Sequence, residues 1–372
     1  MSYAGSVSLE FKPELDPPGK NSEIRDGLSA VVQVGNTLWV ANDETLTLER
    51  LSRQKGAADH DYKYSDHKQF ALEDYLSLPD PTKKTLEVDL EGLDYKDGYL
   101  WLIGSHSLKR GNPKPENSRG DNRKCLADVD PKSNRFLLAR IPLVEQGKTF
   151  TLTKKVEQGG KKYTAARLRG DKKGDDLTKV LADDEHLGSF LAIPSKDNGF
   201  DIEGLAVMGD RLFVGLRGPV LGGWAVILEL ELEEKDDFTL KLKKIGPDNQ
   251  PYRKHFLQLN GLGIRDLCVL DDDLLILAGP TMMLDGPVFL FRWAGGAKPE
   301  KQSLVFKEEL KRSRVKLPSG QKEGFDHPEG ITLFSLDGDG IDSILVVYDS
   351  AAETRHEASS AVKADIFALP QY

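Results

Sequence analysis

The sequence predicts an all-β fold: a β-propeller, in which small antiparallel sheets, or blades, stand around a central channel. A five-residue pattern supports this prediction. It recurs as Asp89–Leu93, Asp201–Leu205 and His327–Ile331, with weaker copies at Ile24–Leu28 and Gly263–Leu267. The three strong copies are each followed by a turn and a short apolar run. A repeat unit of this size is typical of propellers and other repeat arrays.

Each unit is predicted to contain up to four strands. The first carries the acidic pattern, and a turn rich in glycine, asparagine and aspartate joins it to a β-branched and aromatic second strand. The second strands are expected at 38–40, 100–102, 212–214, 274–276 and 344–346. The third strands are expected at 47–51, 135–141, 225–230, 288–293 and 365–369. More polar segments at 69–72, 149–156, 238–244 and 303–307 predict outer strands with one solvated face.

We expect five four-stranded blades, with six as the alternative. The last unit lacks a fourth strand of its own. The alternating segment Ser6–Phe11 is expected to pair with this unit and close the ring, which removes exposed sheet edges. A solenoid is the competing architecture, but the N-terminal strand and the absence of polar capping repeats favour a ring.

The spacing of the repeats indicates where the extra residues lie. The interval from Glu203 to Asp266 equals that from Asp266 to Glu329, whereas the interval from Glu91 to Glu203 is much longer. We attribute the excess to insertions at about 105–133 and 157–199, with a helix expected near 175–190. A degenerate sixth blade in this stretch is the alternative.

The composition indicates a soluble globular protein that forms one domain over residues 1–372. The net charge of −9 disfavours nucleic-acid binding, which needs a basic surface. No apolar run approaches the length of a membrane span. The two cysteines and the absence of a signal peptide lead us to expect a cytoplasmic protein. The sequence leaves the oligomeric state open.

The strand order of a blade places the acidic pattern and the end of the second strand at the same face of the ring. Because the first strands line the channel, the charged residues of the pattern are expected to converge at one mouth. These residues are Asp26, Glu91, Glu203, Arg265, Asp266 and Glu329, with Asp43, His106, Arg217 and Asp349 around them. Converging ionisable groups in a concave place are candidates for function.

Neighbouring carboxylates raise one another's pKa unless a positive charge compensates them. One solution is a hard cation such as Ca²⁺, with oxygen ligands from Asp26, Glu91, Glu203, Asp266 and Glu329. The other is neutralisation by Arg25, Arg217 and Arg265 through paired hydrogen bonds. A ring that only satisfies backbone groups along the channel is the structural alternative.

The Asp-hydrophobic-Glu-Gly-Leu pattern and the stretch Gly215–Pro219 resemble those of a family of bacterial propeller proteins of unassigned function. That family is similar to the phytase-like and esterase-like propeller proteins. The resemblance spans most of the chain and implies a propeller. In the better-known relatives it also implies a calcium-dependent hydrolase site at the channel mouth. The matching positions are Glu91, Glu203, Glu329 and Arg217. Arg-Asp replaces the Glu motif in the first and fourth units, and phytase-like relatives are usually described with six units.

Three functions are consistent with these features. The first is a calcium-dependent hydrolase of an anionic or ester substrate, with Glu91, Glu203, Glu329, Arg217 and His106 as candidate catalytic residues. His106 is included because a histidine can titrate near neutrality. The second is a non-catalytic scaffold that binds a small molecule or a protein at the channel mouth. The third is a glycosidase, in which two carboxyl groups act as acid and as nucleophile or base.

Overall fold

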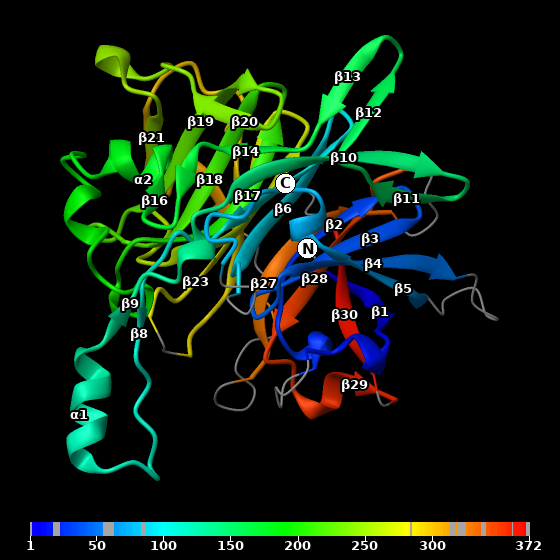
Figure 1. Ribbon diagram of the computed structural model, residues 1–372, viewed down its shortest axis with the longest axis horizontal. Helices are drawn as coiled ribbons and strands as arrows, with labels where there is room; N and C mark the ends of the chain where they lie inside the picture. Colours follow the sequence, from blue (N-terminus) through cyan, green and yellow to red (C-terminus); the bar gives the residue numbers. More distant parts are fainter. Residues whose placement is uncertain are drawn as a thin grey trace.

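The computed structural model describes residues 2–17, 23–54, 63–82, 87–282, 285–312, 317, 325–335, 340–358 and 360–369. In these ranges the chain is all-β, and short antiparallel sheets stand around a common centre (Figure 1). No helix within them is both long enough and apolar enough to cross a membrane. Below, each unit is named after its first strand.

The β2 unit is an antiparallel meander. It consists of β2 (Leu28–Val34), β3 (Thr37–Asn42), β4 (Thr47–Gln54) and β5 (Lys63–Ala71). Gly35, in the turn between β2 and β3, has a φ of 55°, which glycine adopts without strain. The expected strands at 38–40 and 47–51 lie within β3 and β4.

The β27 unit contains both ends of the described chain. It consists of β27 (His327–Phe334), β28 (Ser343–Asp349), β30 (Ala361–Ala368) and β1 (Tyr3–Glu10), with β29 (His356–Glu357) paired to β30. The expected pairing of the N-terminal strand is confirmed, because β1 runs antiparallel to β30 with Val7 opposite Ala364. β1 also pairs briefly in parallel with β5, with Ser8 opposite Lys63. The N-terminal strand therefore joins the last unit to the first.

Two units in the middle of the chain share an outer edge. The β6 unit consists of β6 (Leu90–Lys96), β7 (Tyr99–Gly104), β10 (Leu138–Gln146), β11 (Thr149–Leu152) and β14 (Ala166–Leu168). The β17 unit consists of β17 (Asp201–Met208), β18 (Arg211–Gly218), β19 (Ala225–Asp236), β20 (Thr239–Leu242) and β21 (Arg253–Leu257). β14 pairs in parallel with β20 and so links the two units.

The β22 unit corrects one predicted strand. It consists of β22 (Gly263–Leu270), β23 (Asp273–Gly279), β24 (Phe289–Trp293) and β26 (Leu310–Arg312). The segment 303–307 was expected to be its outer strand, and this is wrong. β25 (Ser303–Val305) instead pairs in parallel with β21 of the preceding unit, and β26 takes the outer position.

The expected insertions contain short elements outside the four-strand pattern. The first forms an arm that extends away from the sheets (Figure 1) and contains β8 (Lys109–Arg110), α1 (Arg119–Ala127) and β9 (Val129–Asp130). The second region contains β12 (Lys155–Gln158), β13 (Lys161–Thr164), β15 (Gly170–Asp171), β16 (Gly174–Asp175) and α2 (Asp176–Leu181). The expected helix is shorter than 175–190, because the Asp184 carboxyl accepts from the backbone N–H groups of His186 and Leu187 and stabilises a turn.

The first strands lie against one another in a closed order: β2 against β6, β6 against β17, β17 against β22, β22 against β27, and β27 against β2. The apolar core lies between successive units. One cluster joins Trp101 of the β6 unit to Val207 and Leu228 of the β17 unit, and another joins Phe213 to Phe291 of the β22 unit. Burial of these faces holds the first strands, and the residues they carry, side by side.

Candidate functional site

Each first strand has an irregularity in its pairing at the same place. The register shifts past Glu91 in β6, past Glu329 in β27 and past Arg265 in β22. In β17 the shift spans Glu203, and in β2 it passes Ser29. A bulge leaves its residue outside the ladder and re-aims the side chain, and bulges are common next to active sites. The repeated acidic pattern therefore encodes a repeated bulge.

This register corrects the alignment of the two weaker copies. The counterpart of Glu91 in β2 is Ser29, and Asp26 lies before the strand, in the 3₁₀ turn Ile24–Asp26. In β22 the counterpart is Arg265, and Asp266 takes the place of the motif glycine. The sequence match of Asp26-Gly27 to Glu-Gly was misleading, because Gly27 lies outside the strand.

The motif glycines allow the next first strand to approach closely. A Cβ atom on Gly92 would lie 2.7 Å from the Leu205 Cβ atom, and one on Gly330 would lie 3.0 Å from the Ala30 Cα atom. A Cβ on Gly204 would lie 3.1 Å from the Cα atom of Asp266. The Glu-Gly pair thus combines a re-aimed carboxyl with a contact between neighbouring units.

Two arginines connect the carboxyl groups of the ring. Arg265 Nη1 lies 3.1 Å from Glu203 Oε2 and 2.7 Å from Glu329 Oε1. Arg217, from the end of β18, lies 2.5 Å from Glu203 Oε1 and 2.5 Å from Asp201 Oδ2. These distances agree with the expectation that Arg217 and Arg265 pair with carboxylates of the ring. Arg25 lies elsewhere and pairs with Glu23 at 2.7 Å.

Glu91 differs from these carboxyl groups. Its side chain is buried, with 9% of the residue exposed, and it makes no hydrogen bond or ion pair within the described part of the chain. Burial raises the pKa of Glu91 well above its ordinary value of 4.5, and the nearby carboxyls of Asp89, Glu203, Glu329 and Asp43 raise it further. Glu91 therefore keeps its proton to a higher pH than an ordinary glutamate does.

Three neighbours share this behaviour. Burial and the charge of Asp349 raise the pKa of Asp43 well above the usual range. Burial raises the pKa of Asp201 to about 7 against the opposing pull of Arg217. Burial and Asp349 raise the pKa of Glu329 to about 8, and Arg265 does not cancel this rise.

We call this group the mouth cluster. Its members are Asp43, Asp89, Glu91, Asp201, Glu203, Glu329 and Asp349, with the arginines Arg135, Arg217 and Arg265. The carboxyl groups outnumber the guanidinium groups, so the cluster must hold protons or a cation to approach neutrality. The raised pKa values show that protons are one way to do so.

Sequence reasoning did not single out Asp89, Asp201 or Arg135. Asp89 pairs with Arg135 at 3.0 Å, just as Asp201 pairs with Arg217. Asp89 and Asp201 occupy the first position of the acidic pattern, so their repetition was a usable signal. Arg135 follows the arm insertion outside any repeated position, and only the fold brings it here.

Several expected site residues lie outside the cluster. Both ring nitrogens of His106 are engaged, with Nδ1 2.8 Å from the Gly104 carbonyl and Nε2 2.7 Å from Asp175 Oδ2. Burial alone would lower the pKa of His106, but Asp175 and the Gly104 carbonyl raise it. The Asp26 carboxyl lies 3.3 Å from His356 Nε2.

The sequence led us to expect Asp266 as a Ca²⁺ ligand, but its carboxyl binds backbone groups instead. Its carboxyl accepts from the backbone N–H of Leu267 and of Ile331, each at 2.8 Å, and so ties β22 to β27. Burial raises its pKa well above the usual range, and the carboxyl that adds to this rise is Asp94, which is not a member of the mouth cluster.

Within the residues that the structure describes, no group of three or more His, Cys, Asp or Glu side chains is arranged to hold a metal ion. The residues expected as calcium ligands are divided between different roles. Glu203 and Glu329 are tied by arginine, Asp266 by backbone, and Asp26 lies outside the strand.

Comparison with known proteins gives a family without an assigned activity. The family described as "Protein of unknown function (DUF3616)" matches residues 27–365. No curated protein matches the sequence. The phytase-like and esterase-like part of the predicted resemblance stays a prediction.

The solved structures that the chain matches share little sequence with it. Glutaminyl cyclase from Myxococcus xanthus has a TM-score of 0.39 and 10% identity, over 98% of both chains. Streptogramin B lyase has a TM-score of 0.35 and 10% identity, over 99% of this chain and 100% of that one. The PQQ-bound aldose sugar dehydrogenase from Streptomyces coelicolor has a TM-score of 0.32 and 10% identity, over 99% and 100%.

Proposed function

The chain belongs to the DUF3616 family of unknown function, and we propose that it is an acid–base hydrolase whose active site is the mouth cluster. The scaffold in this proposal is a propeller of five blades, the β2, β6, β17, β22 and β27 units, closed by the pairing of β1 with β30. Glu91 is the proton donor, and Glu203 and Glu329 are held beside it by the arginines.

The observation that carries the proposal is the state of Glu91. A general acid must keep its proton near neutral pH and must be free to give it to a leaving group. The raised pKa of Glu91 favours the first condition. The second is supported because its carboxyl makes no hydrogen bond or ion pair with the described residues, and Arg217 acts on it only through its charge. Enzymes commonly obtain such an acid by placing one carboxyl in an apolar or acidic setting beside others.

The charge of the cluster limits the substrate. With protons bound to its carboxyl groups the cluster approaches neutrality, so it offers an anionic substrate no net positive charge unless a metal ion is bound. A neutral ester or a neutral glycoside needs no such charge, and a cationic substrate can pair with a carboxyl that ionises. We therefore favour a neutral or cationic substrate over the anionic one expected from the resemblance.

A small panel of substrates with alcohol leaving groups tests this function, because an alkoxide needs a proton as it leaves. The panel contains ethyl acetate, neutral methyl glycosides and methyl phosphate, and release of the alcohol is measured. We expect turnover of an ester or a glycoside, and a loss of about 100-fold or more in kcat for Glu91→Gln, the usual scale for general acid catalysis. Turnover that survives in Glu91→Gln contradicts the proposal. If no substrate of these classes is turned over, the ligand-binding scaffold is favoured instead.

A calcium-dependent hydrolase is the second candidate, because the excess of carboxyl groups would also be offset by a divalent cation. Thermal unfolding with added CaCl₂ and with a chelator separates the two. A rise in Tm with calcium that disappears in Glu91→Gln supports the calcium site. An unchanged Tm counts against the calcium site and favours the acid–base hydrolase, in which protons offset the charge of the carboxyl groups.

A further inference from the structure

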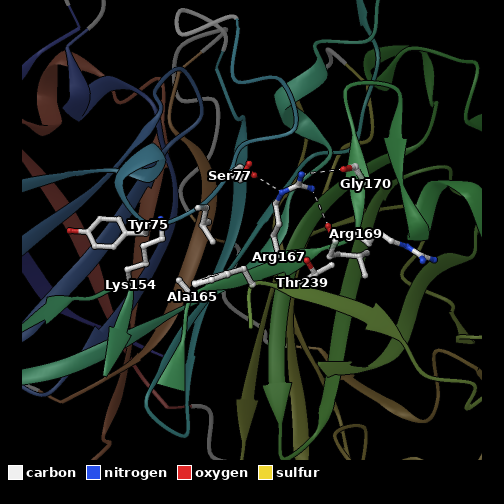
Figure 2. A pocket seen from close by; sticks show the side chains of 11 residues that line it. Tyr75, Ser77, Lys154, Ala165, Arg167, Arg169, Gly170 and Thr239 are labelled. Carbon is white, nitrogen blue, oxygen red and sulfur yellow. Dashed lines mark hydrogen bonds between the residues drawn. The ribbon is translucent and has the colours of Figure 1, made fainter. Parts of the chain in front are cut away.

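A cavity of about 400 Å³ is lined by parts of the chain that contribute nothing to the mouth cluster. Its walls come from Tyr75–Ser77 after β5, from Ala165–Gly170 in and around β14, from Phe238 and Thr239 at the start of β20, and from Lys154 (Figure 2). The volume falls within the roughly 300–1,000 Å³ that is usual for small-molecule sites. The pocket lies where the parallel pair of β14 and β20 links two units.

The guanidinium group of Arg167 lines this pocket, and hydrogen bonds hold it in place through some of its N–H groups. Its Nε donates to the Ser77 carbonyl, its Nη1 to the Leu168 carbonyl at 3.2 Å and its Nη2 to the Gly170 carbonyl at 3.1 Å. Figure 2 shows Arg167 held between Ser77 and Gly170. A guanidinium carries five N–H groups, so one N–H on each terminal nitrogen is left over. Such a pair of N–H groups suits the two oxygens of a carboxylate.

The charge of Arg167 is not neutralised by an ion pair. All three of its hydrogen bonds go to backbone carbonyls, and no carboxylate in the described ranges lies within ion-pair distance of it. Burial lowers its pKa, and the more distant Asp175 and Asp171 only partly oppose this. Arg167 is half-buried and so partly shielded from water, and an anionic ligand would compensate its charge.

Lys154 provides a second positive charge in the pocket. Its side chain is exposed and makes no ion pair within the described part of the chain, and its Nζ lies 5.8 Å from the centre of the Phe238 ring. Arg169 also lines the pocket, but its guanidinium lies 2.9 Å from Asp176 Oδ2, so its charge is already compensated. The uncompensated charge is therefore that of Arg167 and Lys154.

The rest of the lining is apolar or aromatic. Leu76, Ala165 and Leu168 are buried, Tyr75 is half-buried, and the Phe238 ring is 48% exposed. An exposed phenylalanine beside an open cation can receive the flat apolar part of a ligand. An inorganic anion would leave this part of the surface uncovered.

We propose that this pocket binds an organic anion, a carboxylate carried on a small aromatic body, with its oxygens on Arg167, its ring against the apolar and aromatic lining that includes Phe238, and Lys154 adding positive charge to the same pocket. The site is separate from the mouth cluster, and the proposal does not depend on the reaction proposed there.

Titration of the full chain with benzoate, benzamide and acetate, followed by calorimetry or NMR, tests the proposal. Benzamide has the shape of benzoate without its charge, and acetate has the charge without the ring. We expect one benzoate per chain, with both other probes at least tenfold weaker. Equal binding of benzamide overturns the role of the charge, equal binding of acetate overturns the role of the ring, and no benzoate binding overturns the site.

Variants place the benzoate in the pocket. Lys154→Gln is expected to weaken binding about fivefold, the upper end for a solvent-exposed ion pair. Lys155→Gln is the matched control, because Lys155 is an exposed neighbour that does not line the cavity, and it should change nothing. Arg167→Lys keeps the positive charge but loses the pair of N–H groups that the two carboxylate oxygens would accept from, so it should weaken binding further. A Tm measurement confirms that this variant is folded.

Glu91→Gln separates this site from the mouth cluster. Benzoate binding should be unchanged in this variant, whatever happens to hydrolysis. Benzoate binding that is lost in Glu91→Gln but retained in Lys154→Gln and Arg167→Lys would overturn the assignment to this pocket.

Discussion

At the scale of single residues, Glu91 and Arg265 play opposite parts. Glu91 is buried without a partner, and its raised pKa records the cost of ionising it there. Arg265 offsets the charge of Glu203 and Glu329 and also donates to the Pro280 carbonyl at 3.1 Å. A carboxyl that is costly to ionise and an arginine that compensates two others thus lie at equivalent bulges in different units.

Removing the charge of Glu91 should stabilise the protein. Glu91→Gln is expected to raise the free energy of unfolding at neutral pH by about 1 kcal/mol, because the amide cannot ionise beside its acidic neighbours. Chemical denaturation measures the change. Glu157→Gln, at an exposed position, is the control and should be neutral. A less stable Glu91→Gln would show that the carboxyl makes favourable contacts in the folded state.

Removing Arg265 should have the opposite effect. Arg265→Gln leaves Glu203 and Glu329 with less positive charge between them, and breaking a buried pair typically costs about 3–5 kcal/mol. Arg119→Gln, on the exposed helix α1, removes the same charge without a buried partner and should be neutral in the same denaturation experiment. If the two variants have the same free energy of unfolding, the ion pairs of Arg265 with Glu203 and Glu329 do not stabilise the fold.

The sequence was a good guide to some of these residues and a poor guide to others. Glu91, Glu203 and Glu329 could be found because the Asp-hydrophobic-Glu-Gly pattern repeats nearly unchanged, and strand alternation then places them together. Ser29 could not be found, since a serine carries no trace of the pattern and the similar Asp26-Gly27 lies next to it. The pairing of His106 with Asp175 could not be foreseen, because Asp175 lies far away in the sequence.

At the scale of elements, side chains join one first strand to the next. The Asp94 carboxyl accepts from the Val207 N–H at 2.6 Å, and the Ser29 hydroxyl donates to the Leu90 carbonyl at 2.6 Å. Asp266 does the same for Ile331. These contacts fix neighbouring strands that have no shared ladder, and they explain why polar residues interrupt otherwise apolar strands.

Adding a methyl group at Gly92 should force β6 and β17 apart. In Gly92→Ala the new Cβ would lie 2.9 Å from the backbone N atom of Leu205 and 2.7 Å from its Cβ, closer than such atoms pack. Overpacking of this kind costs about 1–3 kcal/mol or more, and we expect Tm to fall accordingly. Gly120→Ala is the control, because its nearest neighbour is the Ser118 hydroxyl at 3.7 Å and alanine favours the helix.

The predicted elements were most reliable where the pairing is local. First and second strands follow one another through short turns, and alternation with turn residues locates them. The outer strands were less certain, since β25 pairs with β21 and β14 with β20, and such pairings between units leave no short-range signal.

At the scale of the whole molecule, the mouth cluster should make stability depend on pH. A carboxyl whose pKa is raised on folding holds its proton more tightly in the folded state than in the unfolded state. Its stabilising effect is therefore complete below the ordinary pKa and is lost as pH rises through the folded value. For Asp201 this window runs from 3.8 to about 7, and for Glu329 from 4.5 to about 8.

We therefore expect the free energy of unfolding to decrease between about pH 5 and pH 8, as these carboxyl groups ionise. Denaturant titrations across this range measure the slope. Glu329→Gln should flatten the upper part of the curve, whereas Glu157→Gln should leave it unchanged. A stability that rises over this interval would contradict the raised pKa values.

The closed order of the first strands accounts for the site as a whole. Each unit contributes one bulge, and the ring brings residues from Ser29 to Glu329 to one place although they are distant in the sequence. The sequence could indicate the repeat and the closing strand, because both follow from local patterns. It could not indicate which carboxyl has a raised pKa and which pairs with an arginine, since that depends on contacts across the ring.

The most direct test of the central claim is a pH titration of the Glu91 carboxyl carbon by NMR, with the signal assigned by its absence in Glu91→Gln. The account predicts a midpoint well above the ordinary value of 4.5, as a proton donor that works near neutral pH requires. A midpoint close to 4.5 would show that Glu91 is an ordinary carboxylate, and it would remove the proton donor on which the proposed function depends.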